Sequence, residues 1–233
     1  MRETLLCIHG AGFTGRVFEA QRAAFADLQA PDLPGHNNAG EAASVEQFAD
    51  YVEAYIQAEG LSRVVLCGHS LGGAIALQLA LRALPQIRAL VLVGSGARLR
   101  VNAPLLEGLQ HDFKSTARSI AGLLYADSRS PLVAQATQSF VRVGQAQTLR
   151  DFLACNAFDV SAQLSKINLP VLAITGQQDV MTPPKYAQAL AAGVLNGSFM
   201  LIKNAGHMVM QERPAETNAA VKDFVTGLWS RAH

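Results

Sequence analysis

The sequence predicts an α/β protein in which a mostly parallel sheet carries helices on both faces. Short apolar runs alternate with segments of helical periodicity, which is typical of parallel strands joined by crossover helices. Several of these runs are apolar at almost every position, as expected of strands that are covered on both faces. From Arg98 to Asn168 the strand pattern stops, and short amphipathic helices are expected instead. The chain therefore predicts a sheet whose topology is interrupted by one helical insertion.

The composition indicates a folded protein with a substantial core and limits its partners. Half of the 233 residues are apolar and only 16% are charged. The net charge is +1 and the basic residues are dispersed, so we expect no nucleic-acid partner and no binding to a membrane. The sequence has no secretory signal pattern and no membrane-spanning run, and its three cysteines suit buried free thiols. We therefore expect a cytoplasmic protein and leave its oligomeric state open.

Four strands are expected in the first half of the chain, and helices alternate with them. Ser44 and Gln47 have the spacing of a capping box, which predicts that a helix begins at Ser44. The expected strands are Thr4–Ile8, a short one within Gln29–His36, Arg63–Cys67 and Ile87–Val93, and the expected helices are Val17–Leu28, Ser44 to about Gly60, and Ala74–Ala83.

The alternation resumes after the insertion, where two more strands and two more helices are expected. Within the insertion, Pro131 and Gly144 are expected to interrupt the helices. Because the strand pattern stops after residue 97 and resumes after residue 168, we divide the chain into a first core part (1–97), a helical insertion (98–168) and a second core part (169–233). The expected later elements are the strands Pro170–Gly176 and Ser198–Ile202 and the helices from about Pro184 to Ala192 and from Pro214 to about Trp229.

The junction between the third strand and the helix after it carries the clearest chemical pattern. An apolar, β-branched run leads into Gly68–Gly72, which reads Gly-His-Ser-Leu-Gly, and a helix-forming run follows at once. Strand, sharp turn and helix are the context of a nucleophile elbow. The serine at its apex adopts a strained backbone, and glycines are needed where neighbouring side chains would clash. The pattern predicts that Ser70 presents its hydroxyl above the sheet, at the positive end of a helix dipole.

A serine nucleophile needs a base within hydrogen-bond reach, and the base needs an acceptor that orients it. Ser70, Asp179 and His207 each lie just after an expected strand, so all three should meet at the carboxyl edge of the sheet. We predict that His207 takes the serine proton and that Asp179 orients the imidazole ring. The backbone N–H groups of Ala11 and Leu71 are expected to form the oxyanion hole.

Four motifs in this order resemble the α/β-hydrolase superfamily, in particular its small carboxylesterase-like and lactonase-like serine hydrolases with a helical cap. They are His9–Gly12, Asp32–His36, Gly68–Gly72 and Gly206-His207. The resemblance covers essentially the whole chain and implies that the insertion is a cap. The family usually has a β-hairpin before the His-Gly strand, whereas this sequence begins at that strand, so a sheet of about six strands is expected. The loop after His36 also departs from the family pattern.

The resemblance implies a serine hydrolase that cleaves small, fairly apolar carboxylic esters, lactones or thioesters through an acyl-enzyme on Ser70. Two alternatives remain open at this point: a carbon–carbon bond hydrolase of ring-cleavage products, and a binding protein of the same fold that perceives a small ligand. The six histidines lack metal-ligand spacing, so no metal is expected, and no cofactor is expected either. The physiological substrate is not predicted.

Other polar and aromatic residues have simpler interpretations. His9, His36 and His69 are expected to be structural, and Asp32 and Asp159 are the rival candidates for the acid. The strand Ile87–Val93 ends in Gly94-Ser95, so the acid position that some relatives use there is empty. The cap aromatics that could line a pocket are Phe113, Tyr125, Phe140, Phe152 and Phe158, of which Phe140 and Phe152 are the first candidates.

Overall fold

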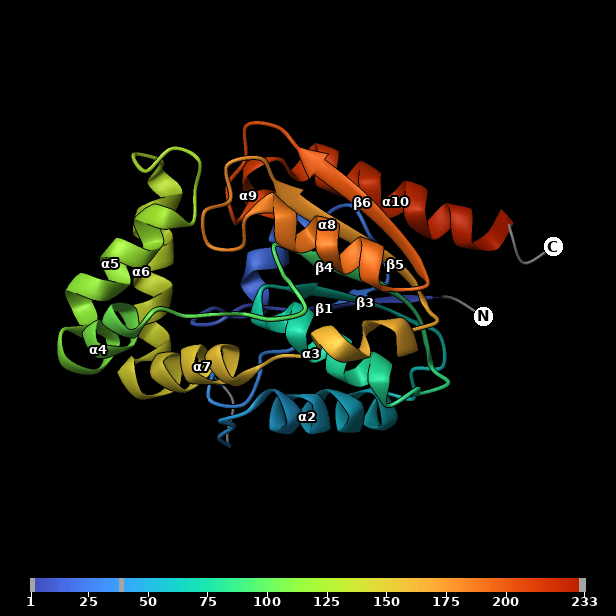
Figure 1. Ribbon diagram of the computed structural model, residues 1–233, viewed down its shortest axis with the longest axis horizontal. Helices are drawn as coiled ribbons and strands as arrows, with labels where there is room; N and C mark the ends of the chain where they lie inside the picture. The colour runs from blue at the N-terminus through green and yellow to red at the C-terminus, as the bar shows by residue number, and fades with distance from the viewer. Residues whose placement is uncertain (1–2, 38–39, 231–233) are drawn as a thin grey trace.

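The computed structural model describes residues 3–37 and 40–230 and contains one six-stranded sheet (Figure 1). All of its strand pairs are parallel, in the order β2-β1-β3-β4-β5-β6. The predicted fold class and the expected six strands are therefore confirmed. The strands are β1 (Thr4–Ile8), β2 (Leu28–Gln29), β3 (Val64–His69), β4 (Ile87–Val93), β5 (Pro170–Gly176) and β6 (Asn196–Ile202).

The helices between the strands cover the sheet and bury its central strands. In Figure 1, α2 and α3 lie below the sheet and α10 lies above it. Every residue of β3 is buried, whereas most residues of the edge strand β6 are exposed. In the described residues no helix is long and apolar enough to cross a membrane. The helices outside the insertion are α1 (Glu19–Arg22), α2 (Val45–Ala58), α3 (Leu71–Leu81), α8 (Pro184–Gly193), α9 (Val209–Glu212) and α10 (Pro214–Ser230), with 3₁₀ helices η1 (Gly15–Phe18) and η2 (Ser161–Lys166).

The insertion between β4 and β5 forms a cap-like group of helices. It stands at the end of the sheet toward which the arrows of β5 and β6 point (Figure 1). Its two ends meet, because Arg98 and Asp159 form an antiparallel bridge and an ion pair of 3.1 Å. The helices of the insertion are α4 (Ala103–His111), α5 (Phe113–Leu123), α6 (Pro131–Val143) and α7 (Gln145–Ala157).

Two elements near the N-terminus are shorter than the periodicity predicts. The helix expected over Val17–Leu28 is only η1 followed by α1, because Leu28 instead pairs with Leu5 in the sheet. The strand expected within Gln29–His36 ends at Gln29, since Pro31 and Pro34 have no N–H for a strand ladder. Part of the polar loop that follows, residues 38–39, lies outside the described residues.

Local capping explains three further boundaries. Ser44 caps α2 by accepting from Gln47 N at 3.3 Å, but the Gln47 side chain accepts from Ala43 N rather than from Ser44 N. Pro131 does not interrupt a helix as expected; it begins α6, because its missing N–H costs nothing in the first turn. Gly144, with φ +89°, separates α6 from α7 as expected.

Candidate active site

Ser70 lies at the apex of the tight turn between β3 and α3, in the strained backbone that an elbow requires. Its φ is +52° and its ψ is −114°, a conformation that residues with a side chain rarely adopt. Close backbone packing on both sides explains the two glycines. A Cβ at Gly68 would lie 2.2 Å from Gly72 O, and a Cβ at Gly72 would lie 2.0 Å from Ile8 O. The turn therefore holds Ser70 in one position above the sheet.

The main chain of Ser70 is fixed by the neighbouring strand. Ser70 N donates to Val93 O at 3.0 Å, and the hydroxyl of Ser95 donates to Ser70 O at 2.9 Å. Ser95 lies just after β4, at the place where some relatives carry an acid. Here that place is occupied by a hydroxyl that supports the elbow.

Asp179 and His207 form a buried hydrogen-bonded pair at the carboxyl edge of the sheet. His207 Nδ1 lies 2.9 Å from Asp179 Oδ2, and both side chains are almost inaccessible to solvent. Asp179 also accepts from the backbone N–H groups of Met181 and Thr182, at 2.9 and 2.8 Å, and from the Thr182 hydroxyl at 2.8 Å. Burial by itself raises the pKa of Asp179, but the charge of His207 and these hydrogen bonds lower it below its usual value.

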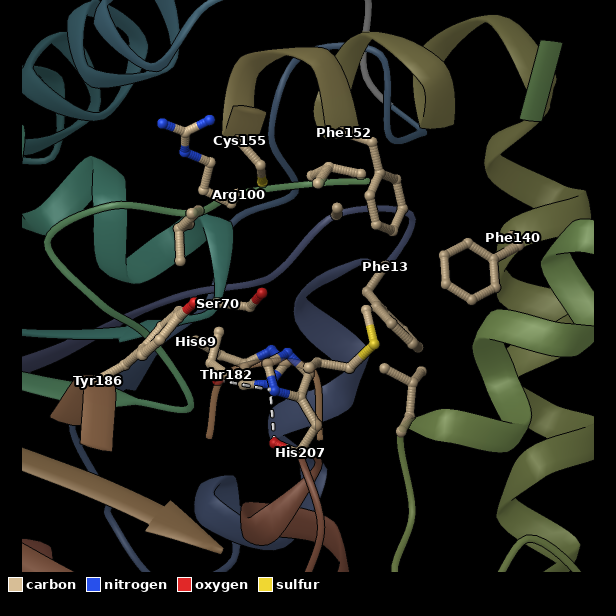
Figure 2. A pocket seen from close by; sticks show the side chains of 15 residues that line it. Phe13, His69, Ser70, Arg100, Phe140, Phe152, Cys155, Thr182, Tyr186 and His207 are labelled. Carbon is tan, nitrogen blue, oxygen red and sulfur yellow. Dashed lines mark hydrogen bonds between the residues drawn. The ribbon is translucent and has the colours of Figure 1, made fainter. Parts of the chain in front are cut away.

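Ser70 and His207 line the same cavity, which lies between the sheet edge and the cap (Figure 2). Since His207 Nδ1 faces Asp179, the Nε2 atom is the one available to a nucleophile. Ser70 Oγ forms no hydrogen bond within the described part of the chain. Such contacts are often long without substrate and tighten only when substrate binds.

His69 supports His207 and stays uncharged. Its Nε2 donates to His207 O at 3.2 Å, and the two rings lie 4.8 Å apart. Burial, together with the neighbouring His207, lowers the pKa of His69 to about 3. His69 is thus a neutral side chain in the cavity wall, in agreement with the structural role expected for it.

The two expected oxyanion donors have free N–H groups. Gly10 O accepts from Phe13 N at 3.3 Å and from His9 Nδ1 at 3.0 Å. Because a trans peptide points its N–H away from its C=O, the N–H of Ala11 faces the opposite direction. Leu71 is the first residue of α3, where the helix leaves its N–H groups unpaired. Among the described residues, neither N–H has an acceptor.

The structure brings neither rival acid to His207. Asp32 accepts from Gly15 N at 2.8 Å and holds a different turn. Asp159 pairs with Arg98 at the end of the insertion, where it is exposed. Asp179 is therefore the acid that the fold places beside the imidazole.

The cavity beside Ser70 measures about 60 Å³ and is mainly apolar. Phe140 and Phe152 reach into it from the cap helices, opposite Ser70 (Figure 2). The other three cap aromatics considered above do not line it. Several residues that line the cavity were not predicted from the sequence. Thr182 is the one for which the sequence held a signal, because an Asp followed three residues later by Thr is a common side-chain-capped turn. The missed residues are Phe13, Leu99, Arg100, Val101, Leu124, Cys155, Met181, Thr182 and Tyr186.

Several known proteins with similar sequences and structures are named as esterases or lactonases. The pimeloyl-[acyl-carrier protein] methyl ester esterase of Neisseria meningitidis serogroup B is 29% identical over 94% of this chain and 92% of that protein. The solved structure of a thermophilic esterase is 30% identical with a TM-score of 0.87, and the match covers 97% of this chain and 90% of that one. The enol-lactonase from Burkholderia xenovorans LB400, at 22% identity and a TM-score of 0.88, shares the fold over 97% of this chain and 92% of its own.

These relatives agree with the expected class of carboxylic ester hydrolase. They do not favour a carbon–carbon bond hydrolase or a ligand-perceiving binding protein. A profile of the alpha/beta hydrolase family matches residues 5–220, which is nearly the whole chain. The chain therefore belongs to the alpha/beta hydrolase family.

Proposed function

We propose that this protein hydrolyses small, fairly apolar carboxylic esters through an acyl-enzyme on Ser70. The observation that carries the proposal is the strained Ser70 backbone at the elbow, in a cavity that it shares with the buried His207–Asp179 pair. The esterases among the relatives support the same reaction class. The partner is then a small-molecule ester. The low net charge supports the absence of a nucleic-acid partner, and the three buried free cysteines support a cytoplasmic location.

In the first half of the reaction, Ser70 Oγ attacks the ester carbonyl carbon while His207 Nε2 takes the hydroxyl proton. Asp179 accepts from Nδ1, which fixes the tautomer and stabilises the imidazolium. The N–H groups of Ala11 and Leu71 would bind the oxyanion, a contribution of about 3 kcal/mol per donor. Collapse of the tetrahedral intermediate breaks the bond to the alkoxy oxygen, and His207 returns the proton to the leaving alcohol.

In the second half, water replaces the alcohol and cleaves the acyl-enzyme. His207 takes a proton from the water, whose oxygen attacks the acyl carbon, and then returns a proton to Ser70 Oγ. The products are the carboxylic acid and the regenerated enzyme. Lactones and thioesters undergo the same acyl transfer, so they remain within the proposed substrate class.

The size of the cavity supports a short acyl group. A single water molecule needs a cavity volume of about 10–15 Å³. The cavity of about 60 Å³ therefore has room for only a few heavy atoms. Its aromatic side chains come partly from the insertion, which we propose to be a cap over residues 98–168. The cap would exclude water from the acyl site and limit acyl length.

We predict that Ser70→Ala abolishes ester hydrolysis without unfolding the protein, because alanine fits the apex and lacks only the nucleophile. The measurement is turnover of p-nitrophenyl acetate, together with circular dichroism and mapping of a fluorophosphonate adduct. More than a few per cent of residual turnover, or an adduct on a different serine, would show that Ser70 is not the nucleophile.

We predict that Thr182→Val lowers kcat/KM about tenfold, because the lost hydrogen bond to a charged group contributes about 1.5–3 kcal/mol. Thr182→Ser retains the hydroxyl and serves as the matched control, with activity close to that of the wild type. If both variants behave alike, the Thr182 hydroxyl does not support Asp179.

The same substitution should also shift acid unfolding. The pKa of Asp179 is lowered in the folded protein, so its ionised form stabilises the fold above the ordinary carboxyl pKa, and this stabilisation is lost as the pH falls. Removal of the Thr182 hydrogen bond raises the pKa, so Thr182→Val should begin to lose stability at a higher pH than Thr182→Ser. Identical acid unfolding curves would contradict this explanation.

We predict that Phe152→Ala favours longer acyl chains, because it enlarges the cavity beside the acyl group. The ratio of kcat/KM for p-nitrophenyl hexanoate to that for the acetate should rise about tenfold. This estimate follows because each additional methylene group that fits an apolar pocket stabilises the transition state by about 1–3 kcal/mol. The control is Phe158→Ala, which removes a buried aromatic that does not line the cavity. If both variants lose stability but neither changes the ratio, the cap does not select acyl length.

A further inference from the structure

The insertion contains a buried carboxylate that has no part in the Asp179–His207 pair. Asp151 lies in α7, is fully inaccessible to solvent, and contacts the core. Its Oδ2 accepts from Gly12 N at 2.8 Å and lies 2.7 Å from His36 Nε2. Its Oδ1 accepts from the Gln147 side chain at 2.9 Å. A buried carboxylate is costly unless it is paired and hydrogen-bonded, and this one has a partner at each oxygen.

The hydrogen bonds of His36 show that Asp151 faces a positive charge. His36 Nδ1 lies 3.0 Å from Pro34 O, and Nε2 lies 2.7 Å from Asp151 Oδ2. With Asp151 ionised, both partners are acceptors, so both ring nitrogens carry a proton, which a neutral imidazole cannot provide. Burial by itself lowers the pKa of His36, but its hydrogen bond to Asp151 and the charge of Asp151 outweigh burial and raise it.

The other groups around this ion pair carry no charge. His9 faces His36 with a ring separation of 4.8 Å, and burial lowers its pKa to about 3. Phe48 of α2 covers another side of the His36 ring. Cys155 lies one turn beyond Asp151 in α7, and burial together with that carboxylate raises the pKa of its thiol. These buried neighbours therefore add no further charge to the ion pair.

Asp151 acts on the turn that carries the proposed oxyanion donor Ala11. The turn closes through Phe13 N and Gly10 O, and Gly12 adopts a φ of +70° in it. The Gly10–Ala11 peptide is held at Gly10 O, which accepts from His9 Nδ1 and Phe13 N. The Ala11–Gly12 peptide is held at Gly12 N, which donates to Asp151 Oδ2. The two peptide planes that meet at Ala11 are thus anchored from opposite sides.

A second helix of the insertion holds the same glycine. Ser139 of α6 donates its hydroxyl to Gly12 O at 3.0 Å. The ring of Phe140 packs so closely that a Cβ at Gly12 would lie 2.2 Å from it. In Figure 2 this ring lies beside Phe13, across the cavity from Ser70. Both polar groups of Gly12 are therefore bound by the insertion rather than by the core.

We propose that Asp151 is a positioning residue for ester hydrolysis, because it holds Gly12 N–H and so directs the N–H of Ala11 toward the developing oxyanion. Its ion pair with His36 fixes the carboxylate, and Ser139 assists from the other side of Gly12. The insertion is then part of the oxyanion hole as well as a cover over the cavity. This inference rests on the proposed function, since it requires an oxyanion intermediate on Ser70.

The test separates positioning from mere attachment of the cap. Asp151→Asn keeps an oxygen for Gly12 N–H but removes the ion pair that fixes it. A misplaced donor weakens binding of the transition state more than binding of the substrate, and a misplacement of about 1 Å can cost about 100-fold in rate. We therefore expect kcat for p-nitrophenyl acetate to fall 10- to 100-fold, with KM changed less than threefold.

A trifluoromethyl ketone, which forms a tetrahedral adduct with serine, provides the second readout. Its Ki should weaken by the same factor as kcat/KM in Asp151→Asn. Ser139→Ala is a milder change that should lower kcat and inhibitor affinity about threefold. This variant can still contradict the inference if Asp151→Asn does not fold. The matched controls are Asp159→Asn and Ser119→Ala, which remove a cap-end ion pair and a hydrogen bond within α5, and both should stay within twofold of the wild type.

The pH dependence of stability gives an independent readout. Because the pKa of His36 is raised in the folded protein, its ion pair is fully formed below the ordinary histidine pKa of about 6.5 and is lost as the pH rises through the raised value. The difference in Tm between the wild type and Asp151→Asn should be largest near pH 6 and shrink toward pH 9.

Three results would overturn the inference. If Asp151→Asn or Ser139→Ala lowers Tm while kcat and Ki remain at wild-type values, these residues only attach the insertion. If KM rises and kcat is unchanged, Asp151 acts on substrate entry. A wild-type protein without esterase activity would overturn both this inference and the proposed function, whereas the first two results would leave the proposed function intact.

Discussion

The strained conformation of Ser70 is the constraint on which the rest of the active edge depends. A positive φ in a residue with a side chain is unfavourable by about 1–3 kcal/mol, and it persists only where the surroundings leave no alternative. Here Gly68 has no room for a Cβ because α3 lies against it at Gly72, and Gly72 has none because the end of β1 lies against it at Ile8. Ser95 and Val93 bind the two peptide groups of the serine. The position of the hydroxyl is thus set by the packing of strand, turn and helix.

A second constraint is the parallel sheet, which brings distant parts of the chain to one edge. Asp179 follows β5 and His207 follows β6, and the two strands pair along their whole length. Their side chains therefore meet although 28 residues separate them. The insertion leaves from the end of β4 and returns before β5, so it covers this edge without disturbing the sheet. Contacts from α6 and α7 to the Gly12 turn join the insertion to the core beside the proposed oxyanion donor Ala11.

Much of this arrangement could be predicted from the sequence because it depends on local patterns. Apolar runs identified five of the six strands, and β2 overlaps its expected segment only at Gln29. The positions of Ser70, Asp179 and His207 just after their strands identified them as neighbours. The details that failed depend on contacts that no local pattern encodes. Leu28 leaves an expected helix because it pairs with Leu5, 23 residues away. Pro131 is a different case, because the Ser130-Pro131 pair is a local signal for a helix start that was interpreted as an interruption.

The buried pair of Asp151 and His36 shows the same limit more clearly. These residues lie 115 positions apart, and neither has a neighbour in the sequence that marks it as charged and buried. His36 was expected to be structural, but its partner could come only from the folded insertion. Asp151 itself carried no signal, since an aspartate in a polar helix is ordinarily exposed to solvent.

The proposed function depends on a covalent acyl group that forms on Ser70 during ester cleavage. The most direct measurement is intact-protein mass spectrometry of enzyme mixed with p-nitrophenyl butyrate and quenched with acid within milliseconds to seconds. If Ser70 is acylated, the protein mass should rise transiently by one butyryl group, located on the peptide that contains Ser70. A burst of p-nitrophenol should appear with matching amplitude. Steady turnover with no acylated protein at any quench time, and no burst, would contradict the proposed acyl-enzyme.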